Sequence, residues 1–283
     1  MGAAETTTPR IALALGGGSA RGLAHILMLE AFDELGVKPT AIAGTSIGAI
    51  VGGMYAAGLS AAEIRQFAEE LLSSRVEIFR RLAKSYGGLP SLWSVRRPSV
   101  VDGVTLFELL MPKQLRCDFA ALRIPFHTVA ADYYAMGQVV VNSGPLIPAI
   151  AASAALPAIF KPVVIGGRAL VDGGFVNPTP WDVVQAGADF TVAVDVTGQT
   201  DAYPVGQRPA DAIPSTVDAW VGCSQIAFRA IMREKMSIRS PDLMIRPAVG
   251  NFGTMDFVKI REIFAASVPA KDELKRGLER RLS

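Results

Sequence analysis

The feature that most constrains this chain is the pattern Gly-x-Ser-x-Gly at residues 44–48, which follows a short apolar run at 41–43. Glycines two positions on either side of a serine allow two backbones to pass close together, so the serine can sit on a strained turn with its hydroxyl exposed. The pattern predicts a strand, a sharp turn that presents Ser46, and a helix over 47–57 whose N-terminal amides favour negative charge. Because so short a pattern arises by chance in roughly one chain in ten of this length, a plain Gly/Ser turn is the alternative.

Composition indicates a globular protein with a large core. The chain has 283 residues, of which 50% are hydrophobic and 19% charged, a length that permits one or two domains. A net charge of +2 is too small to indicate a nucleic-acid partner. The only cysteines are Cys117 and Cys223, so a disulfide framework and a Cys/His metal cluster are excluded. A reduced, cytoplasmic setting, without a metal or a cofactor, is the simplest interpretation.

The long uncharged segments are interpreted as parts of a soluble core rather than as membrane spans. The first ten residues lack the basic start and the apolar run of a signal peptide. Residues 39–62 and 133–160 carry no charge, but glycines interrupt the first stretch and prolines the second. Neither stretch has the Leu, Ile and Phe content of a spanning helix.

Apolar runs of strand length alternate with helical patterns along the chain. A buried strand is expected at 11–15, a helix at 23–35 that Gly36 ends, and a helix from the capping box Ser60-Ala-Ala-Glu63 to about residue 73. The later expectations are strands at 124–130 and 138–141, a helix at 146–156, a hairpin of 163–165 with 169–171, a helix at 181–185, a strand at 191–196, a helix at 216–238, a strand at 242–246, and closing helices at 256–266 and 270–282. This order is typical of an α/β fold with helices on both faces of a mostly parallel sheet.

We expect one domain over 10–283 after a flexible N-terminal tail at 1–9. Residues 75–98 carry six basic residues against one acid, with aromatic residues between them. This segment is interpreted as a lid-like insertion that contacts an anionic membrane surface at the periphery, with a solvated surface excursion as the alternative. Residues 200–214 contain Pro, Asp and Gly and are expected to form a mobile loop.

A serine nucleophile needs a base, and the sequence offers few candidates. His25 and His127 are the only histidines, and both fit structural positions, in a helix and a strand. Since no histidine follows Asp172, the order Ser, acid, His of α/β-hydrolases is not met. Asp172 is the best candidate base, because it ends an apolar run and precedes Gly173 and Gly174, although an Asp-Gly turn is a common structure in itself.

The glycine-rich stretch at 16–22, Gly-Gly-Gly-Ser-Ala-Arg-Gly, follows the first expected strand. The dinucleotide frame Gly-x-Gly-x-x-Gly fails in both registers, because Arg21 and Ser19 stand where glycine is needed, and the next strand carries Gly44 where the frame needs an acid. We interpret the stretch as an anion cradle. Consecutive amides with Arg21 nearby would stabilise the oxyanion of a tetrahedral acyl intermediate.

Together these segments resemble the patatin-like phospholipase family. Three motifs carry the resemblance, each after a strand and in the family's order, and supporting glycines lie within them at Gly16, Gly22, Gly44, Gly48, Gly173 and Gly174. The resemblance extends to Arg-Gly-Leu-Ala-His at 21–25, to Ser-Ala-Ala-Leu-Pro at 153–157 and to 171–177. It covers residues 10–200 well and the remainder loosely. It implies a three-layer α/β/α fold on which a Ser–Asp dyad cleaves acyl esters of lipids, without histidine or metal.

Carried over to this chain, the resemblance makes Ser46 the nucleophile and Asp172 its base, with an oxyanion hole from Gly17, Gly18, Ser19 and Arg21. One position departs from the family, since its third loop glycine is here Ser19, which leaves open which of the loop amides are the donors and lets Ser19 narrow the site. The expected function is hydrolysis of phospholipid, lysophospholipid or acylglycerol esters. Acyl transfer to an acceptor other than water and a non-enzymatic regulator of the same fold are the alternatives.

Overall fold

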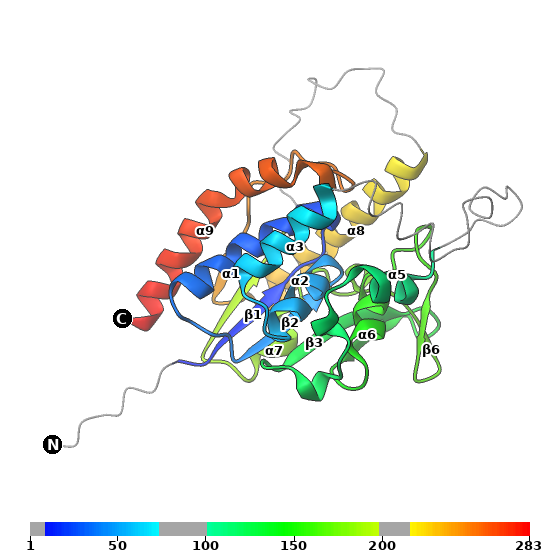
Figure 1. Ribbon diagram of the computed structural model, residues 1–283, viewed down its shortest axis with the longest axis horizontal. Coiled ribbons are helices and arrows are strands. Elements are labelled where there is room, and N and C mark those ends of the chain that lie inside the picture. Colours follow the sequence, from blue (N-terminus) through cyan, green and yellow to red (C-terminus); the bar gives the residue numbers. More distant parts are fainter. Residues whose placement is uncertain (1–8, 74–100, 198–215) are drawn as a thin grey trace, which may run out of the picture.

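The computed structural model describes residues 9–73, 101–197 and 216–283 (Figure 1). The expected lid-like segment at 75–98 and the loop at 200–214 lie outside these ranges, as does the N-terminal tail up to residue 8. Contact of 75–98 with a membrane therefore stays a prediction. None of the helices in the described ranges has both the length and the apolar composition needed to cross a bilayer.

A mostly parallel sheet of eight strands forms the centre of the fold, in the order β5-β6-β3-β2-β1-β7-β8, with β4 paired to β3. Five strands run parallel to one another: β1 Ile11–Leu15, β2 Ala41–Thr45, β3 Phe126–Asp132, β7 Phe190–Val194 and β8 Leu243–Ile245. Three pair antiparallel: β4 Gly137–Val141, β5 Val163–Ile165 and β6 Arg168–Asp172. The inner strands are buried on both faces, which explains their near-continuous apolar sequences.

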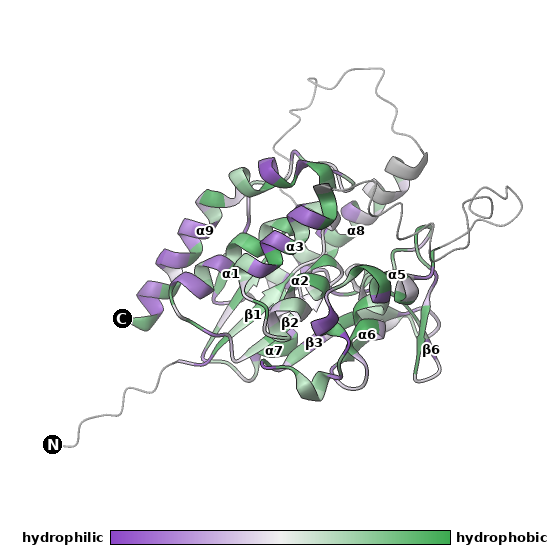
Figure 2. Cartoon of the chain, viewed as in Figure 1, coloured by the Kyte–Doolittle hydropathy of each residue, from purple (hydrophilic) through white to green (hydrophobic). Residues whose placement is uncertain are grey.

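The two faces of the sheet carry side chains of different size. Ile11, Leu13 and Leu15 of β1 join the large core under the helices α1 Ala24–Glu34, α2 Ile47–Ala56, α3 Ala61–Ser73, α6 Leu146–Ser153 and α9 Ile260–Leu282. Ala12 and Ala14 point to the opposite face, where small side chains allow α7 Trp181–Gln185 and α8 Thr216–Ile238 to approach closely. The three-layer α/β/α arrangement is thereby confirmed. Figure 1 shows α1, α3 and α9 side by side, and Figure 2 shows hydrophilic residues along α9.

Local signals placed several boundaries correctly. The capping box is present, because the Ser60 amide donates to Glu63 Oε2 at 2.7 Å and the Glu63 amide to Ser60 Oγ at 3.3 Å. Gly36 follows α1 with φ of +65°, a conformation that favours glycine. The hairpin of β5 and β6 turns at Gly166 and Gly167, both with positive φ, as expected.

Other boundaries differ from the expectation. The helix expected from residue 23 is preceded by a 3₁₀ turn, η1 Ser19–Leu23, and α1 begins at Ala24. The two closing helices are one helix, α9, which continues through Pro269. A proline inside a helix costs about 3 kcal/mol, and burial of Ile263, Leu274 and Leu278 against the core offsets that cost. The helix expected from residue 256 begins with a 3₁₀ turn, η6 Phe257–Lys259, which leads into α9. Segments without any expectation form α5 Gly103–Leu110, η3 Lys113–Leu115, η4 Phe119–Ala121 and η5 Gly173–Phe175.

Candidate active site

The serine of the Gly-x-Ser-x-Gly pattern lies on a strained turn between β2 and α2. Ser46 has φ of +55° and ψ of −121°, outside the regions that side-chain-bearing residues prefer. A Cβ at Gly48 would lie 2.1 Å from the Leu15 carbonyl oxygen, and one at Gly44 would lie 2.5 Å from the Gly48 carbonyl oxygen. Both glycines are therefore needed for the close approach of β1, β2 and α2 that forms the turn.

Asp172 reaches Ser46 because β3 is longer than β2. Thr45, the last residue of β2, pairs with Val129, and β3 continues to Asp132. β6 runs back along this extension and ends with Asp172 opposite Ala130. The Ser46 hydroxyl donates a hydrogen bond of 2.7 Å to Asp172 Oδ2, so the two residues singled out from the sequence are brought together across 126 positions of the chain.

The Asp172 carboxyl is almost fully buried, and this burial changes its acidity. Loss of solvation raises its pKa from the ordinary 3.8 to about 6, while hydrogen bonds from the Gly174 amide, at 2.8 Å, and from the Ser46 hydroxyl oppose the rise. The carboxylate is thus ionised at neutral pH with a pKa close to that range. This is the state required of a general base that takes a proton from a serine hydroxyl.

The glycine loop lies beside the serine at Gly17 and Ser19. The Gly17 amide already donates to the Pro178 carbonyl at 2.8 Å, and a Cβ at Gly17 would lie 3.3 Å from Ser46 Cβ. The amides of Gly18 and Ser19 have no hydrogen-bond acceptor within the described parts of the chain. Ser19 has φ of +52°, a region where glycine is the usual residue, and its side chain lines the same cavity as Ser46.

Arg21 does not belong to this group, contrary to the expectation from the sequence. Its guanidinium donates to the carbonyls of Thr197, at 2.7 Å, and Phe252, at 2.8 Å, and burial lowers its pKa. The Ala20 amide donates to the Thr254 carbonyl at 3.0 Å. Arg21 therefore ties the glycine loop to the chain after β7 and to the turn before α9, and its side chain does not line the cavity of Ser46.

An apolar cavity of about 270 Å³ opens beside the serine and the aspartate. Its polar lining side chains, among the described residues, are Ser19, Ser46 and Asp172. The rest of the wall is aliphatic, aromatic or methionine side chains: Leu23, Ile26, Ile47, Ile50, Val51, Met54, Phe67, Ala68, Leu71, Leu72, Phe107, Met111, Ala154, Leu156, Ile159, Phe160, Met255 and Phe257. Such a wall accommodates hydrocarbon and offers a charged group no partner beyond the two catalytic candidates and Ser19.

The histidines lie in structural positions. His25 is fully buried, with Nε2 2.7 Å from the Gly16 carbonyl oxygen, and burial lowers its pKa to about 4, so it is neutral and Nε2 donates to that carbonyl. His127 lies in β3, half-buried, with its pKa also lowered by burial. Neither lines the cavity. Within 9–73, 101–197 and 216–283, no group of three His, Cys, Asp or Glu side chains could hold a metal ion.

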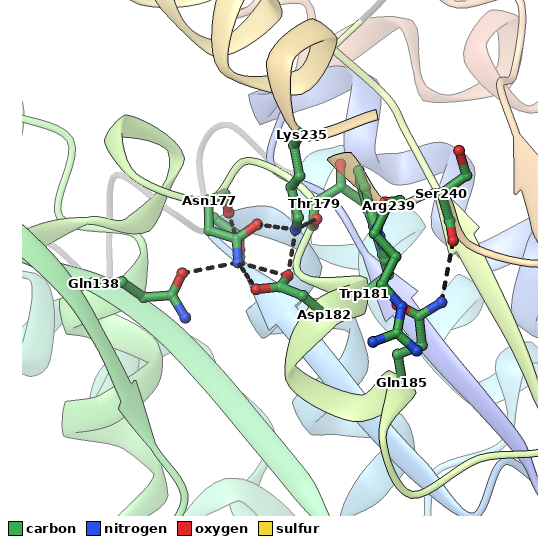
Figure 3. Close-up of polar contacts among 10 residues, drawn as sticks. Gln138, Asn177, Thr179, Trp181, Asp182, Gln185, Lys235, Arg239 and Ser240 are labelled. Atoms are coloured by element: carbon green, nitrogen blue, oxygen red, sulfur yellow. Dashed lines mark hydrogen bonds and ion pairs between the residues drawn. The ribbon is translucent and has the colours of Figure 1, made fainter. Parts of the chain in front are cut away.

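A polar network around Lys235 holds the chain that follows Asp172 (Figure 3), and the sequence analysis did not identify it. Lys235, on α8, donates from Nζ to Asn177 Oδ1 at 2.5 Å, to the Thr179 carbonyl at 2.7 Å and to Asp182, and it lies 3.8 Å from the centre of the Trp181 ring. The Asn177 side-chain amide donates to Asp182 and to Gln138 of β4, both at 2.9 Å. The only sequence signal was that Asn177 ends one of the resembling stretches.

The network reaches both members of the pair through Asn177. The backbone amide of Asn177 donates at 2.8 Å to the carbonyl of Gly173, the residue after Asp172. The Asn177 carbonyl accepts a hydrogen bond of 2.8 Å from Thr45 Oγ1, one residue before Ser46. Lys235 thus fixes a loop that contacts the chain next to each catalytic candidate.

Comparison with known proteins places these features in a family. A model of the patatin-like phospholipase family matches residues 13–184. An uncharacterized NTE family protein of Mycobacterium tuberculosis is 36% identical over 217 residues, 76% of this chain and 56% of that protein. Patatin-like phospholipase domain-containing protein 6 of Mus musculus is 28% identical, over 90% of this chain and 20% of its own length. Lysophospholipase NTE1 of Kluyveromyces lactis is 28% identical, over 90% and 18%. The chain thus spans little more than half of the first relative and about a fifth of the others.

Proposed function

Because the chain belongs to the patatin-like phospholipase family, we propose that it is a serine acyl hydrolase that cleaves ester bonds of lipids. The observation that carries the proposal is the 2.7 Å hydrogen bond from Ser46 to the buried Asp172 at the wall of an apolar cavity. Ser46 is the nucleophile, Asp172 the base, and the amides of Gly18 and Ser19 are the oxyanion donors.

In the first half of the reaction, Ser46 Oγ attacks the ester carbonyl carbon while its proton passes to Asp172 Oδ2. The negative charge on the carbonyl oxygen is stabilised by the Gly18 and Ser19 amides and by the N-terminus of α2. When the tetrahedral intermediate collapses, the ester C–O bond breaks and the departing alkoxide takes the proton from Asp172. The acyl group remains on Ser46.

In the second half, water attacks the acyl carbonyl and gives its proton to Asp172. The C–O bond to Ser46 then breaks, Ser46 Oγ takes the proton back, and the fatty acid leaves. The buried Asp172 carboxyl, with a pKa of about 6, can accept and return a proton near neutral pH in each half.

The acyl chain of the substrate occupies the apolar cavity, and the head group stays outside it. The wall consists of aliphatic, aromatic and methionine side chains. A hydrocarbon chain that leaves water to contact such a wall is stabilised by about 25 cal/mol per Å² of apolar surface buried. Met255, which lines the cavity, and Val258, next to the cavity-lining Phe257, are 59% and 55% exposed, so the apolar surface continues to the exterior beside the cavity. The lysophospholipase and phospholipase names of the relatives support a lipid ester as the substrate.

A direct test compares the wild type with Ser46→Ala on p-nitrophenyl esters of increasing chain length and on phospholipids and lysophospholipids. We expect hydrolysis by the wild type alone, and covalent labelling of Ser46 by a fluorophosphonate probe, read by mass spectrometry of the peptide that contains it. A wild type that is neither labelled nor active would instead support a non-enzymatic role.

We further propose that the basic and aromatic segment at 75–98 contacts anionic lipid. Binding to liposomes that rises with anionic lipid and falls with salt would support it. Binding that ignores both would contradict it.

A further inference from the structure

Ser153, the last residue of α6, contacts the backbone of the proposed nucleophile. Its Oγ accepts a hydrogen bond of 2.9 Å from the Ser46 amide and donates one of 2.6 Å to the Val129 carbonyl of β3. The side chain is fully buried, with 0% exposure. One hydroxyl thus satisfies two backbone groups, one in the turn after β2 and one in β3, with both its donor and an acceptor site in use.

The Ser46 amide needs a partner of this kind because of where Ser46 stands. It lies between the last residue of β2 and the first residue of α2, and its φ of +55° takes the backbone out of both helical and extended geometry. The carbonyl of Ser46 accepts the first bonds of α2, from Ala49 and Ile50, but the amide finds its acceptor in a side chain. Ser153 is therefore the group that holds the strained turn from its amide side.

The same short segment also holds the proposed base. The Asp172 amide donates to the Ala155 carbonyl at 3.0 Å, two residues after Ser153. Residues 153–155, anchored to β3 through Val129, thus bind the backbone of Ser46 at one end and that of Asp172 at the other. The relative position of the two catalytic side chains depends on this segment.

We propose that Ser153 is a positioning residue, which holds the Ser46 backbone at the orientation from which Oγ reaches both Asp172 and the substrate carbonyl. The inference rests on the proposed function for its catalytic consequence, but the hydrogen bond itself can be tested without it. Alanine at 153 would leave the Ser46 amide and the Val129 carbonyl without their shared partner. The elbow would then relax, and Ser46 Oγ would sample orientations that cannot attack.

Ser267 supplies a matched control. Its side chain is also 0% exposed and its Oγ donates to a carbonyl, that of Ile263, at 2.7 Å, but it lies on α9 and does not line the cavity. Ser267→Ala therefore removes an equally buried hydroxyl without touching the elbow. Ser153→Thr is the conservative variant, because it keeps both the donor and the acceptor.

The first measurement is independent of activity. Hydrogen exchange of the Ser46 amide, followed in the peptide that spans 44–48, should be faster in Ser153→Ala than in the wild type and unchanged in Ser267→Ala. Exchange that Ser153→Ala leaves unchanged would overturn the inference. Should the alanine variant not fold, Ser153→Cys, whose thiol is a weaker donor and acceptor, replaces it in each comparison.

The second measurement is kinetic, on a short soluble ester. We expect Ser153→Ala to lower kcat by about 10- to 100-fold, as for a misplaced reacting group, with KM nearly unchanged because the acyl cavity is intact. Fluorophosphonate labelling should slow in parallel, Ser153→Thr should restore most of the rate, and Ser267→Ala should keep it. Equal loss in Ser153→Ala and Ser267→Ala would overturn a positioning role. An inactive, unlabelled wild type would instead refute the proposed function, while the exchange comparison would still decide whether Ser153 holds the elbow.

Discussion

The two catalytic candidates are held in place by different means. Ser46 lies where backbones meet at close range: Gly48 packs on the Leu15 carbonyl, and the hydroxyl of Ser153 holds the Ser46 amide. Asp172 precedes a loop that is held through side chains of α8, a helix far later in the chain, by the charged Lys235 network and by Phe228, which packs on Gly174. The serine is thus oriented mainly by close backbone packing, with one buried hydroxyl, and the loop beside the acid mainly by the polar side chains of a distant part of the chain, with one aromatic ring.

This difference matches the role that the proposed mechanism gives to each residue. A nucleophile must point its oxygen in one direction. A strained turn achieves that without any charge when the glycines on either side of it, Gly44 and Gly48, have no room for a Cβ. A base must keep a proton affinity suited to its task, which burial and two hydrogen bonds set for Asp172. The side chain of Lys235 lies between α7 and α8 and supports the loop through Asn177 and the Thr179 carbonyl. It acts on the loop after Asp172 rather than on the Asp172 carboxylate.

The largest expected effect comes from replacing Ser46 or Asp172 itself, because the proposed mechanism needs both side chains. Ser46→Ala and Asp172→Asn should each lower turnover by about 10³-fold or more, and the double variant should be hardly worse than either. Rates on a short ester, with circular dichroism to verify folding, measure this. Near-wild-type turnover by Asp172→Asn would contradict the Ser–Asp mechanism.

The next prediction contrasts steric and polar support directly. Gly48→Ala places a Cβ 2.1 Å from a backbone oxygen that cannot move aside, so we expect a loss of stability of about 3 kcal/mol or more and little folded protein. Lys235→Met keeps the stem of the side chain and removes the charge, and should cost about 1–3 kcal/mol, with a severalfold fall in kcat.

Lys275→Met is the control for Lys235, because Lys275 also pairs with a carboxylate, that of Glu34, but it joins α9 to α1 and does not line the cavity. Chemical denaturation with activity at the same protein concentrations gives both quantities. If Lys235→Met and Lys275→Met behave alike, the network has no special link to the site.

The sequence could predict those parts of the site that depend on contiguous residues. β1, the elbow and the capping box at Ser60 follow from short patterns, and their positions agree with the structure. The partners of Arg21 lie 176 and 231 positions away, and Lys235 looks like an ordinary helix residue until α8 packs on α7. The continuation of α9 through Pro269 likewise depends on burial, which propensity does not include.

The raised pKa of Asp172 provides a prediction of intermediate size, which concerns the proposed base alone. Since the pKa of Asp172 is about 6 in the folded protein, kcat/KM should fall about tenfold per pH unit below that value, as the base becomes protonated. Between pH 4 and 6 the folded state keeps a proton that the unfolded chain has released, so stability should decrease as pH rises, by about 3 kcal/mol in total.

Asp172→Asn should remove this part of the pH dependence of stability, while Ser46→Ala, which loses a hydrogen bond that lowers the pKa, should keep it. Thermal unfolding from pH 4 to 7 measures both. Identical pH profiles for the wild type and Asp172→Asn would contradict the raised pKa.

The smallest expected effect concerns Ser19, whose backbone amide and side chain have separate parts in the proposed site. Its amide is a proposed oxyanion donor, and its side chain lies in the cavity at φ of +52°, where a Cβ costs about 1 kcal/mol. Ser19→Gly should therefore leave the donor in place and stabilise the fold by up to about that amount, less whatever the flexibility of glycine in the unfolded chain takes back. Because the hydroxymethyl group is gone, bulkier acyl groups should gain in kcat/KM relative to acetate esters. A series of esters measured with both forms tests this, and an unchanged order of preference would mean that Ser19 does not narrow the site.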